Sequence, residues 1–416
     1  MTTGNGRTAG TEAAFGHRQP QRVKFRRAGY RVLRVAGLRH ERAFPDYLEF
    51  IPEVRDEQEF ADLSARVTCY LGGTDYSLYL RGSRFSLRPE SVPYLDPALV
   101  KDPGWVDERP QGVGHLVVHR LCPATLRTMS TSRGPFTVVD RRLFTRSEEQ
   151  YFRLRNSTTW PTYAPVEIAL ERLRAVARPG GSAFILATGP SALVVDLATV
   201  TADVRITCNS AVRDLDRIKE YRPNIITFTD PVFHFGPSRY AAGFRRDVVR
   251  AAEAVDALVV CGHGFAGPLL DLQPELRDRL VVIPYQHGGP WRWPTARNPT
   301  VREAGNIMTT LMLPIAFMLA DDISIAGADG RQPTENYFWK HNPQLQYSGE
   351  LMQTVFDAHP SFFRDSVYAD YYESFCADME ELIQCGEAQG KTVRAVAPSW
   401  IPALRRRGAA APVEVA

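Results

Sequence analysis

The stretch AFILATGPSALVVDLATVTADVRITCN, residues 183–209, decides the fold. It begins with an apolar run of strand length and then turns at residues 187–191, where Gly189, Pro190 and Ser191 follow one another. A second short apolar run ends in Cys208-Asn209. Runs that are apolar at nearly every position are typical of strands buried on both faces of a parallel sheet.

Further short apolar runs continue this pattern toward the C-terminus. They lie at residues 224–230, 257–262, 280–285, 322–329 and 392–398. Buried strands that alternate with helical segments predict an α/β domain, and a helical period over 165–178 leads into the first strand. We therefore expect a Rossmann-like, mostly parallel sheet covered by helices over residues 161–404, followed by a disordered tail at 405–416.

The preceding part of the chain predicts a smaller N-terminal α+β accessory module over residues 47–160. Strands are expected over 65–73 and 76–82, joined as a hairpin at a Gly-Gly-Thr-Asp turn, and again near 115–121 and 136–144. His115 and His119 fall on the third of these strands and are expected to be structural.

Composition limits the class of protein. The net charge is only +3, so nucleic acid is not an expected partner, and the basic excess lies in residues 1–46, which hold ten Lys or Arg against three Asp or Glu. This arm is expected to be disordered or loosely packed, and one function for it is peripheral contact with an acidic membrane surface. No apolar run is long enough to span a bilayer, and the six cysteines form no CxxC pair, which favours a cytoplasmic protein with reduced thiols.

Polar residues follow several of the predicted strands at the point where each strand ends. Gly189 and Ser191 follow the first strand, Asn209 the second, Asp230 the third, and Asp329 a later one. The carboxyl ends of parallel strands meet at one edge of a sheet, where ligands bind in the crevice at a topological switch point. Each residue alone is compatible with ordinary turn chemistry, but together they predict a nucleotide site.

The segment after the third strand adds charged and aromatic candidates. His234 and Arg239 are placed to face the crevice, whereas Arg245, Arg246 and Arg250 have helical spacing and are expected to be solvated or to face a partner.

Three of these segments together resemble the bacterial sialyltransferases of glycosyltransferase family 42. The segments are residues 185–209, 227–231 and 305–329, and the resemblance covers roughly residues 182–400. Wider relatives of that family are motility-associated glycosyltransferase-like and pterin diphosphokinase-like proteins. The resemblance implies that the nucleotide is held by a set of residues near the strand ends: Thr188, Gly189, Pro190, Ser191, Asn209, Asp230, Gly305, Asn306 and Asp329. Thr188, Asp230, Gly305, Asn306 and Ala328 differ in identity from the family pattern.

The resemblance also implies a catalytic histidine some thirty residues after Asp329. His359 lies at that interval, and His341 is its competitor. A histidine suits a general base because its ordinary pKa is near neutrality. Residues 330–372 are predicted to form a lid, in which Tyr337 and Lys340 would help the leaving phosphate, with Tyr347 and Arg331 as further candidates.

These expectations combine into an inverting glycosyltransferase that moves a sialic-acid-like nonulosonic acid from a CMP-activated donor to a glycan hydroxyl. No further cofactor is expected, and no metal, because no Asp-x-Asp stands at a suitable position. Two alternatives remain open. One is a Mg²⁺-dependent nucleotide phosphotransferase with Asp230 and Asp329 as ligands, and the other is a non-catalytic nucleotide-binding protein.

Overall fold

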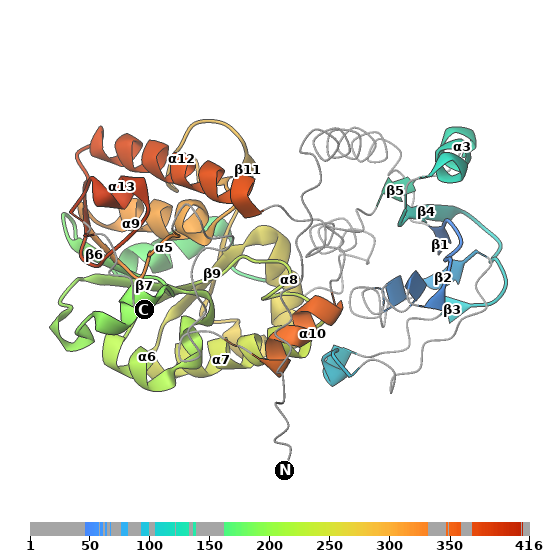
Figure 1. Cartoon of the computed structure of the whole chain (residues 1–416), viewed down its shortest axis with the longest axis horizontal. Helices are drawn as coiled ribbons and strands as arrows, with labels where there is room; N and C mark the ends of the chain where they lie inside the picture. The colour runs from blue at the N-terminus through green and yellow to red at the C-terminus, as the bar shows by residue number, and fades with distance from the viewer. Residues whose placement is uncertain are drawn as a thin grey trace, which may run out of the picture.

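The described part of the chain forms two parallel sheets, each with its own helices (Figure 1). The computed structural model describes residues 46–57, 59–60, 63–64, 67, 76–81, 93–99, 105–120, 122–132, 136–138, 162–331, 347, 349–358, 368–408 and 410. Within these residues, no helix is both long and apolar enough to cross a membrane.

The larger sheet has seven strands, and all of its pairings are parallel. Its strands are β6 (Ser182–Leu186), β7 (Val204–Cys208), β8 (Ile225–Thr227), β9 (Leu258–Gly262), β10 (Leu280–Ile283), β13 (Asp322–Ala326) and β14 (Thr392–Ala395). Each coincides with one of the apolar runs, so the predicted Rossmann-like α/β fold is confirmed.

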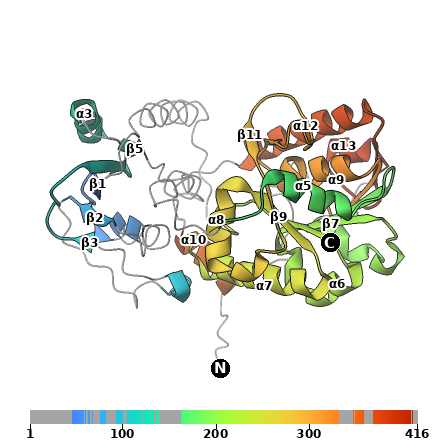
Figure 2. The same ribbon diagram turned by 180° about the vertical axis from the view of Figure 1, so that it is seen from behind.

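Helices cover both faces of this sheet, as the two opposite views show (Figures 1 and 2). One face packs against α5 (Val166–Ala175), α9 (Leu313–Leu319) and α12 (Tyr368–Glu387). The other packs against α6 (Leu215–Tyr221), α7 (Arg239–Val255), α8 (His263–Leu272) and α10 (Glu350–Ala358). The strands therefore contribute buried side chains to both faces, which explains why their sequences are apolar without alternation.

Shorter elements connect these layers. A pair of short parallel strands is made by β11 (Tyr285–His287) and β12 (Val301–Glu303). Single turns of 3-10 helix are η5 (Pro190–Val194), η6 (Leu197–Thr199), η7 (Asn209–Arg213) and η8 (Pro274–Leu276), while η9 (Met308–Met312) is a π-helical segment that leads into α9. The chain connects β6 to β7 through η5 and η6, so the first crossover is made of short turns.

The strand order β10-β9-β8-β7-β6-β13-β14 places a switch point between β6 and β13. From β6 the chain builds outward through β7 to β10, and it then returns to the other side of β6 to add β13 and β14. The crevice beyond the carboxyl ends of β6 and β13 is where ligands bind in sheets of this kind.

The N-terminal module is built on a smaller sheet of order β3-β2-β1-β4-β5. Its strands are β1 (Tyr47–Ile51), β2 (Ser77–Leu80), β3 (Trp105–Val106), β4 (Gly114–Val118) and β5 (Phe136–Val138), and its helical elements include η2 (Pro97–Leu99) and α3 (Pro123–Thr131). Every pairing is parallel, and the order reverses between β1 and β4 in the same way as in the larger sheet.

The predicted hairpin in this module is wrong. Val67, inside the first predicted strand, is helical and fully buried. The strand β2 pairs in parallel with β1, whose residues lie some thirty positions earlier in the chain. The strands expected near 115–121 and 136–144 are confirmed as β4 and β5, and His115 and His119 are buried there.

The C-terminal domain extends past the predicted end at residue 404. Arg407 donates hydrogen bonds to Glu380 and Glu387 of α12, and its carbonyl accepts one from Ala395. The helix α13 (Pro402–Arg405) and the residues just after it are therefore part of the fold rather than of a tail.

Candidate functional site

The Gly189 turn and Asp329 meet at the switch point between β6 and β13. The Asp329 carboxylate accepts hydrogen bonds from the Ser191 amide at 2.9 Å and from the Ser191 hydroxyl at 2.8 Å. The Gly189 amide donates to the Gly327 carbonyl at 2.7 Å, and a side chain on Gly189 would overlap Asp329. Gly327 has φ +71°, a conformation that favours glycine. Ser191 and Asp329, which are 138 positions apart in sequence, thus fix one another at the end of β6.

Asp329 is only 7% exposed, and burial raises the pKa of its carboxyl although the Ser191 hydrogen bonds act in the opposite direction. Its backbone is also held, because the Ser399 hydroxyl donates to the Ala328 carbonyl at 2.7 Å. Asp329 therefore organises the first βα turn in this structure, and its carboxylate oxygens are engaged by Ser191.

Asn209 directly follows the neighbouring strand β7, as the first residue of η7, at the same edge of the sheet. Leu186 of β6 is in register with Thr207 of β7, so Asn209 stands level with Thr188 and next to the Gly189 turn. Asn209 has φ +50°, a left-handed conformation that asparagine adopts more readily than most residues. Its Oδ1 atom is buried and contacts no hydrogen-bond donor of the described chain. A buried acceptor of this kind is costly unless a ligand supplies the donor.

Asp230 has a local structural role at the end of β8. Its Oδ1 accepts hydrogen bonds from the amides of Val232 and Phe233 at 2.8 and 2.9 Å, and its own amide donates to Nδ1 of His234. Asp230 follows β8 and Asp329 follows β13, which are three places apart in the strand order, and each carboxylate accepts hydrogen bonds at its own strand end.

Gly305 and Asn306 form the bend directly before the helix that contains η9. The Asn306 side chain accepts a hydrogen bond from the Met308 amide at 2.8 Å, which satisfies one of the free amides of the first turn. A side chain on Gly305 would overlap the ring of Tyr371 in α12. Thr188 is buried in the first βα turn, and Pro190 occupies the first position of η5.

Two expectations for the segment after β8 are wrong. His234 is buried and stacks on Phe244, and burial together with the charge of Arg245 lowers the pKa of His234 to about 3. Arg245 was expected on a solvated face but is buried, because it binds carbonyls and a carboxylate inside the protein. Arg239, Arg246 and Arg250 are exposed.

The predicted catalytic residues cannot be placed. His359, His341, Tyr337 and Lys340 lie outside the described residues, together with most of the segment expected to form a lid. Tyr347 is described, and it is buried and donates a hydrogen bond to Asp247 of α7.

A polar group at the end of β8 was missed by the sequence reasoning. The Thr229 hydroxyl and the Tyr285 hydroxyl are 2.8 Å apart, and burial raises the pKa of Tyr285 above its usual range. Gly262, at the end of β9, lies against the Tyr285 ring and has no room for a side chain. The sequence Gly-His-Gly at 262–264 is the feature that could have indicated a polar group at this end of the sheet.

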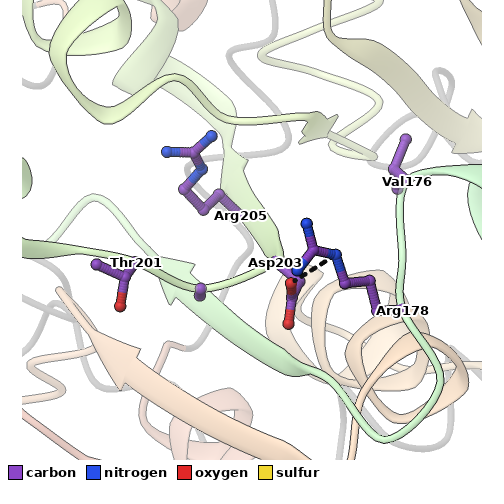
Figure 3. Close-up of a pocket in the computed structure, with 6 residues that line it drawn as sticks. Val176, Arg178, Thr201, Asp203 and Arg205 are labelled. Atoms are coloured by element: carbon purple, nitrogen blue, oxygen red, sulfur yellow. Dashed lines mark ion pairs between the residues drawn. The ribbon is translucent and has the colours of Figure 1, made fainter.

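A solvent-open hollow of about 370 Å³ lies at the opposite edge of the sheet, near the amino ends of β6 and β7. Figure 3 shows Arg178 and Asp203 facing each other there, 3.5 Å apart, with Arg205 and Thr201 nearby. Arg178 is 85% exposed, so this ion pair is strongly screened by solvent. We place the candidate site at the carboxyl ends instead, because buried and oriented polar groups are found there.

Comparison of the whole chain with protein-family models, with curated proteins and with solved structures gives no match.

Proposed function

We propose that this chain is a nucleotide-dependent transferase whose donor site lies beyond the carboxyl ends of β6, β7 and β13. The observation that carries the proposal is the buried, unpartnered Oδ1 atom of Asn209 beside the Gly189 turn. A ligand with an N–H group would satisfy it, and the exocyclic amine of a nucleobase such as cytosine is a donor of this kind.

The turn beside Asn209 suits the rest of a nucleotide. Gly189 packs directly against Asp329, and the amide and hydroxyl of Ser191 are held by the same carboxylate. Fixed polar groups of this kind bind without reorganising, which favours affinity. The placement of the site at the switch point follows the general rule for open parallel sheets.

The finer proposal concerns the donor and rests on the resemblance of residues 185–209, 227–231 and 305–329 to family 42 sialyltransferases. In that proposal a CMP-activated nonulosonic acid is the donor and a glycan hydroxyl is the acceptor. A bond forms between the acceptor oxygen and the anomeric carbon, and the bond from that carbon to the phosphate oxygen breaks. His359 takes the acceptor proton, and Tyr337 and Lys340 stabilise the charge on the departing CMP.

Release of CMP from a CMP-activated nonulosonic acid tests this proposal. We expect CMP to accumulate only when donor and a glycan acceptor are both present, and the rate to be the same in EDTA. An activity that EDTA abolishes and Mg²⁺ restores would instead support the phosphotransferase alternative. A protein that binds nucleotide and turns over no donor would support the non-catalytic alternative.

A further inference from the structure

A short segment of the N-terminal module, residues 93–99, is bound to the C-terminal domain at the start of α7. Leu95 and Ser238 form an antiparallel bridge, and both are buried. Two backbone hydrogen bonds of 2.8 and 2.9 Å flank the bridge, from Asp96 to Pro237 and from Arg239 to Tyr94. The segment therefore pairs directly with the chain that leads out of the β8 loop, residues 230–238.

The next residue of this segment, Asp96, adds a charge to the contact. Its Oδ2 atom lies 3.2 Å from Nη2 of Arg245, whose side chain is 1% exposed. Its Oδ1 atom accepts a hydrogen bond from the Ala98 amide, which fixes Asp96 at the start of η2. A buried guanidinium is strongly unfavourable without a carboxylate beside it, so Arg245 keeps its position because Asp96 is there.

Arg245 in turn holds the β8 loop. Its Nη1 atom donates hydrogen bonds to the carbonyls of His234 at 3.2 Å and Gly236 at 3.1 Å. The imidazole of the same His234 accepts a hydrogen bond from the Asp230 amide at the end of β8. A continuous set of contacts thus joins Asp96 of the N-terminal module to the carboxyl edge of the large sheet.

We infer that Asp96, acting through Arg245, is a positioning residue for the β8 loop. Because β8 pairs with β7, the strand that leads into Asn209, this contact couples the N-terminal module to the candidate nucleotide site. The coupling to nucleotide rests on the proposed function, whereas the hold on the loop does not. Without the carboxylate, the guanidinium would turn toward water and release the two loop carbonyls.

Hydrogen exchange of the full-length chain measures the hold on the loop. In Asp96→Asn we expect the amides of residues 232–236 to exchange at least about tenfold faster, because local opening becomes easier. Asp256→Asn is the matched control. Asp256 is also paired with an arginine, Arg279, but it is 87% exposed at the other end of α7, and its substitution should leave the loop unchanged. Unchanged exchange of the loop in Asp96→Asn would overturn the inference.

A second pair of variants shows whether Asp96 acts through Arg245. In an Arg245→Met background, Asp96→Asn should produce no further acceleration, because the group that it holds is already absent. The double variant carries neither of the two charges, so it gives an answer if Asp96→Asn alone does not fold. Equal acceleration with and without Arg245 would overturn the inference.

Calorimetry with CMP separates this inference from the proposed function. We expect Asp96→Asn to raise the Kd for CMP several-fold while remaining folded, and Asp256→Asn to leave it unchanged. A faster-exchanging loop with an unchanged Kd would overturn the coupling of the loop to the nucleotide site. A wild-type protein that binds no nucleotide would overturn the proposed function and leave the exchange result standing.

Discussion

The two edges of the large sheet differ in how they treat polar groups. At the amino ends of β6 and β7, Arg178 and Asp203 line an open hollow and face solvent (Figure 3). At the carboxyl ends, Asn209 and Asp329 present buried oxygen atoms in fixed directions, and Gly189 is confined by its neighbours. Specific binding and catalysis require polar groups that are shielded from water and held in fixed orientations. An open hollow lined by solvated charges does not provide such groups. This difference between the two edges favours the carboxyl edge as the place of the proposed nucleotide site.

The largest expected effect tests whether that edge catalyses a reaction. If His359 is the general base there, His359→Ala should lower kcat by about 10²–10⁴-fold and leave donor affinity nearly unchanged. The wild-type pH profile should show an acidic limb near the ordinary pKa of histidine, and the variant should lack it. His341→Ala is the control. A loss of kcat in His341→Ala alone would move the role to that residue, and no loss in either would refute a histidine base in this segment.

The next effect concerns the confined turn. Gly189→Ala should lower the free energy of unfolding by roughly 1–3 kcal/mol, because the new methyl group would overlap Asp329 and the Gly327 carbonyl. Gly243→Ala is the control, since the methyl would meet only ordinary contacts in α7, where alanine should raise stability by about 0.5–1 kcal/mol. Chemical denaturation measures both. Equal stability of the two variants would show that the turn is not confined.

The pH dependence of stability examines the buried carboxyl at the same edge. The folded-state pKa of Asp329 is raised above the ordinary value of 3.8, so the folded state binds this proton more tightly than the unfolded state. The contribution of Asp329 to stability is therefore fully present below that ordinary value and is lost as pH rises through the folded-state pKa. Asp329→Asn should remove this dependence, so wild type should lose stability relative to the variant as pH rises above about 4 in urea titrations. A constant difference across this range would contradict the assignment.

The smallest effect is expected at the amino edge. Arg178→Ala should change the free energy of unfolding by less than about 0.5 kcal/mol, because an exposed ion pair contributes little. Nucleotide affinity should not change. Weaker nucleotide binding in this variant would move the functional site to the hollow.

The strands of the large sheet could be predicted because a strand that is buried on both faces is a short apolar run in the local sequence. The parallel pairing of β1 with β2 could not, because the Gly-Gly-Thr-Asp turn at 72–75 is a local hairpin signal and parallel partners are distant in sequence. Arg245 has the spacing of an exposed helical residue, but its partner Asp96 lies 149 positions away. The meeting of Ser191 with Asp329 follows from the strand order, and the convergence of polar residues at the strand ends was expected from the general rule for parallel sheets. The Oδ1 atom of Asn209 is buried without a partner because of how the folded chain packs around it, and a short sequence motif carries no information about that packing.

Calorimetric titration of CMP into wild type and Asn209→Ala tests the central claim most directly. Wild type should bind, and the variant should bind more weakly by about 1–3 kcal/mol, the usual effect of removing a buried polar partner. Asn298→Ala, in the loop between β11 and β12, should bind as wild type does, because its side chain accepts hydrogen bonds from Thr300 within that loop. Unchanged affinity in a folded Asn209→Ala protein would contradict the assignment of the carboxyl edge as the nucleotide site.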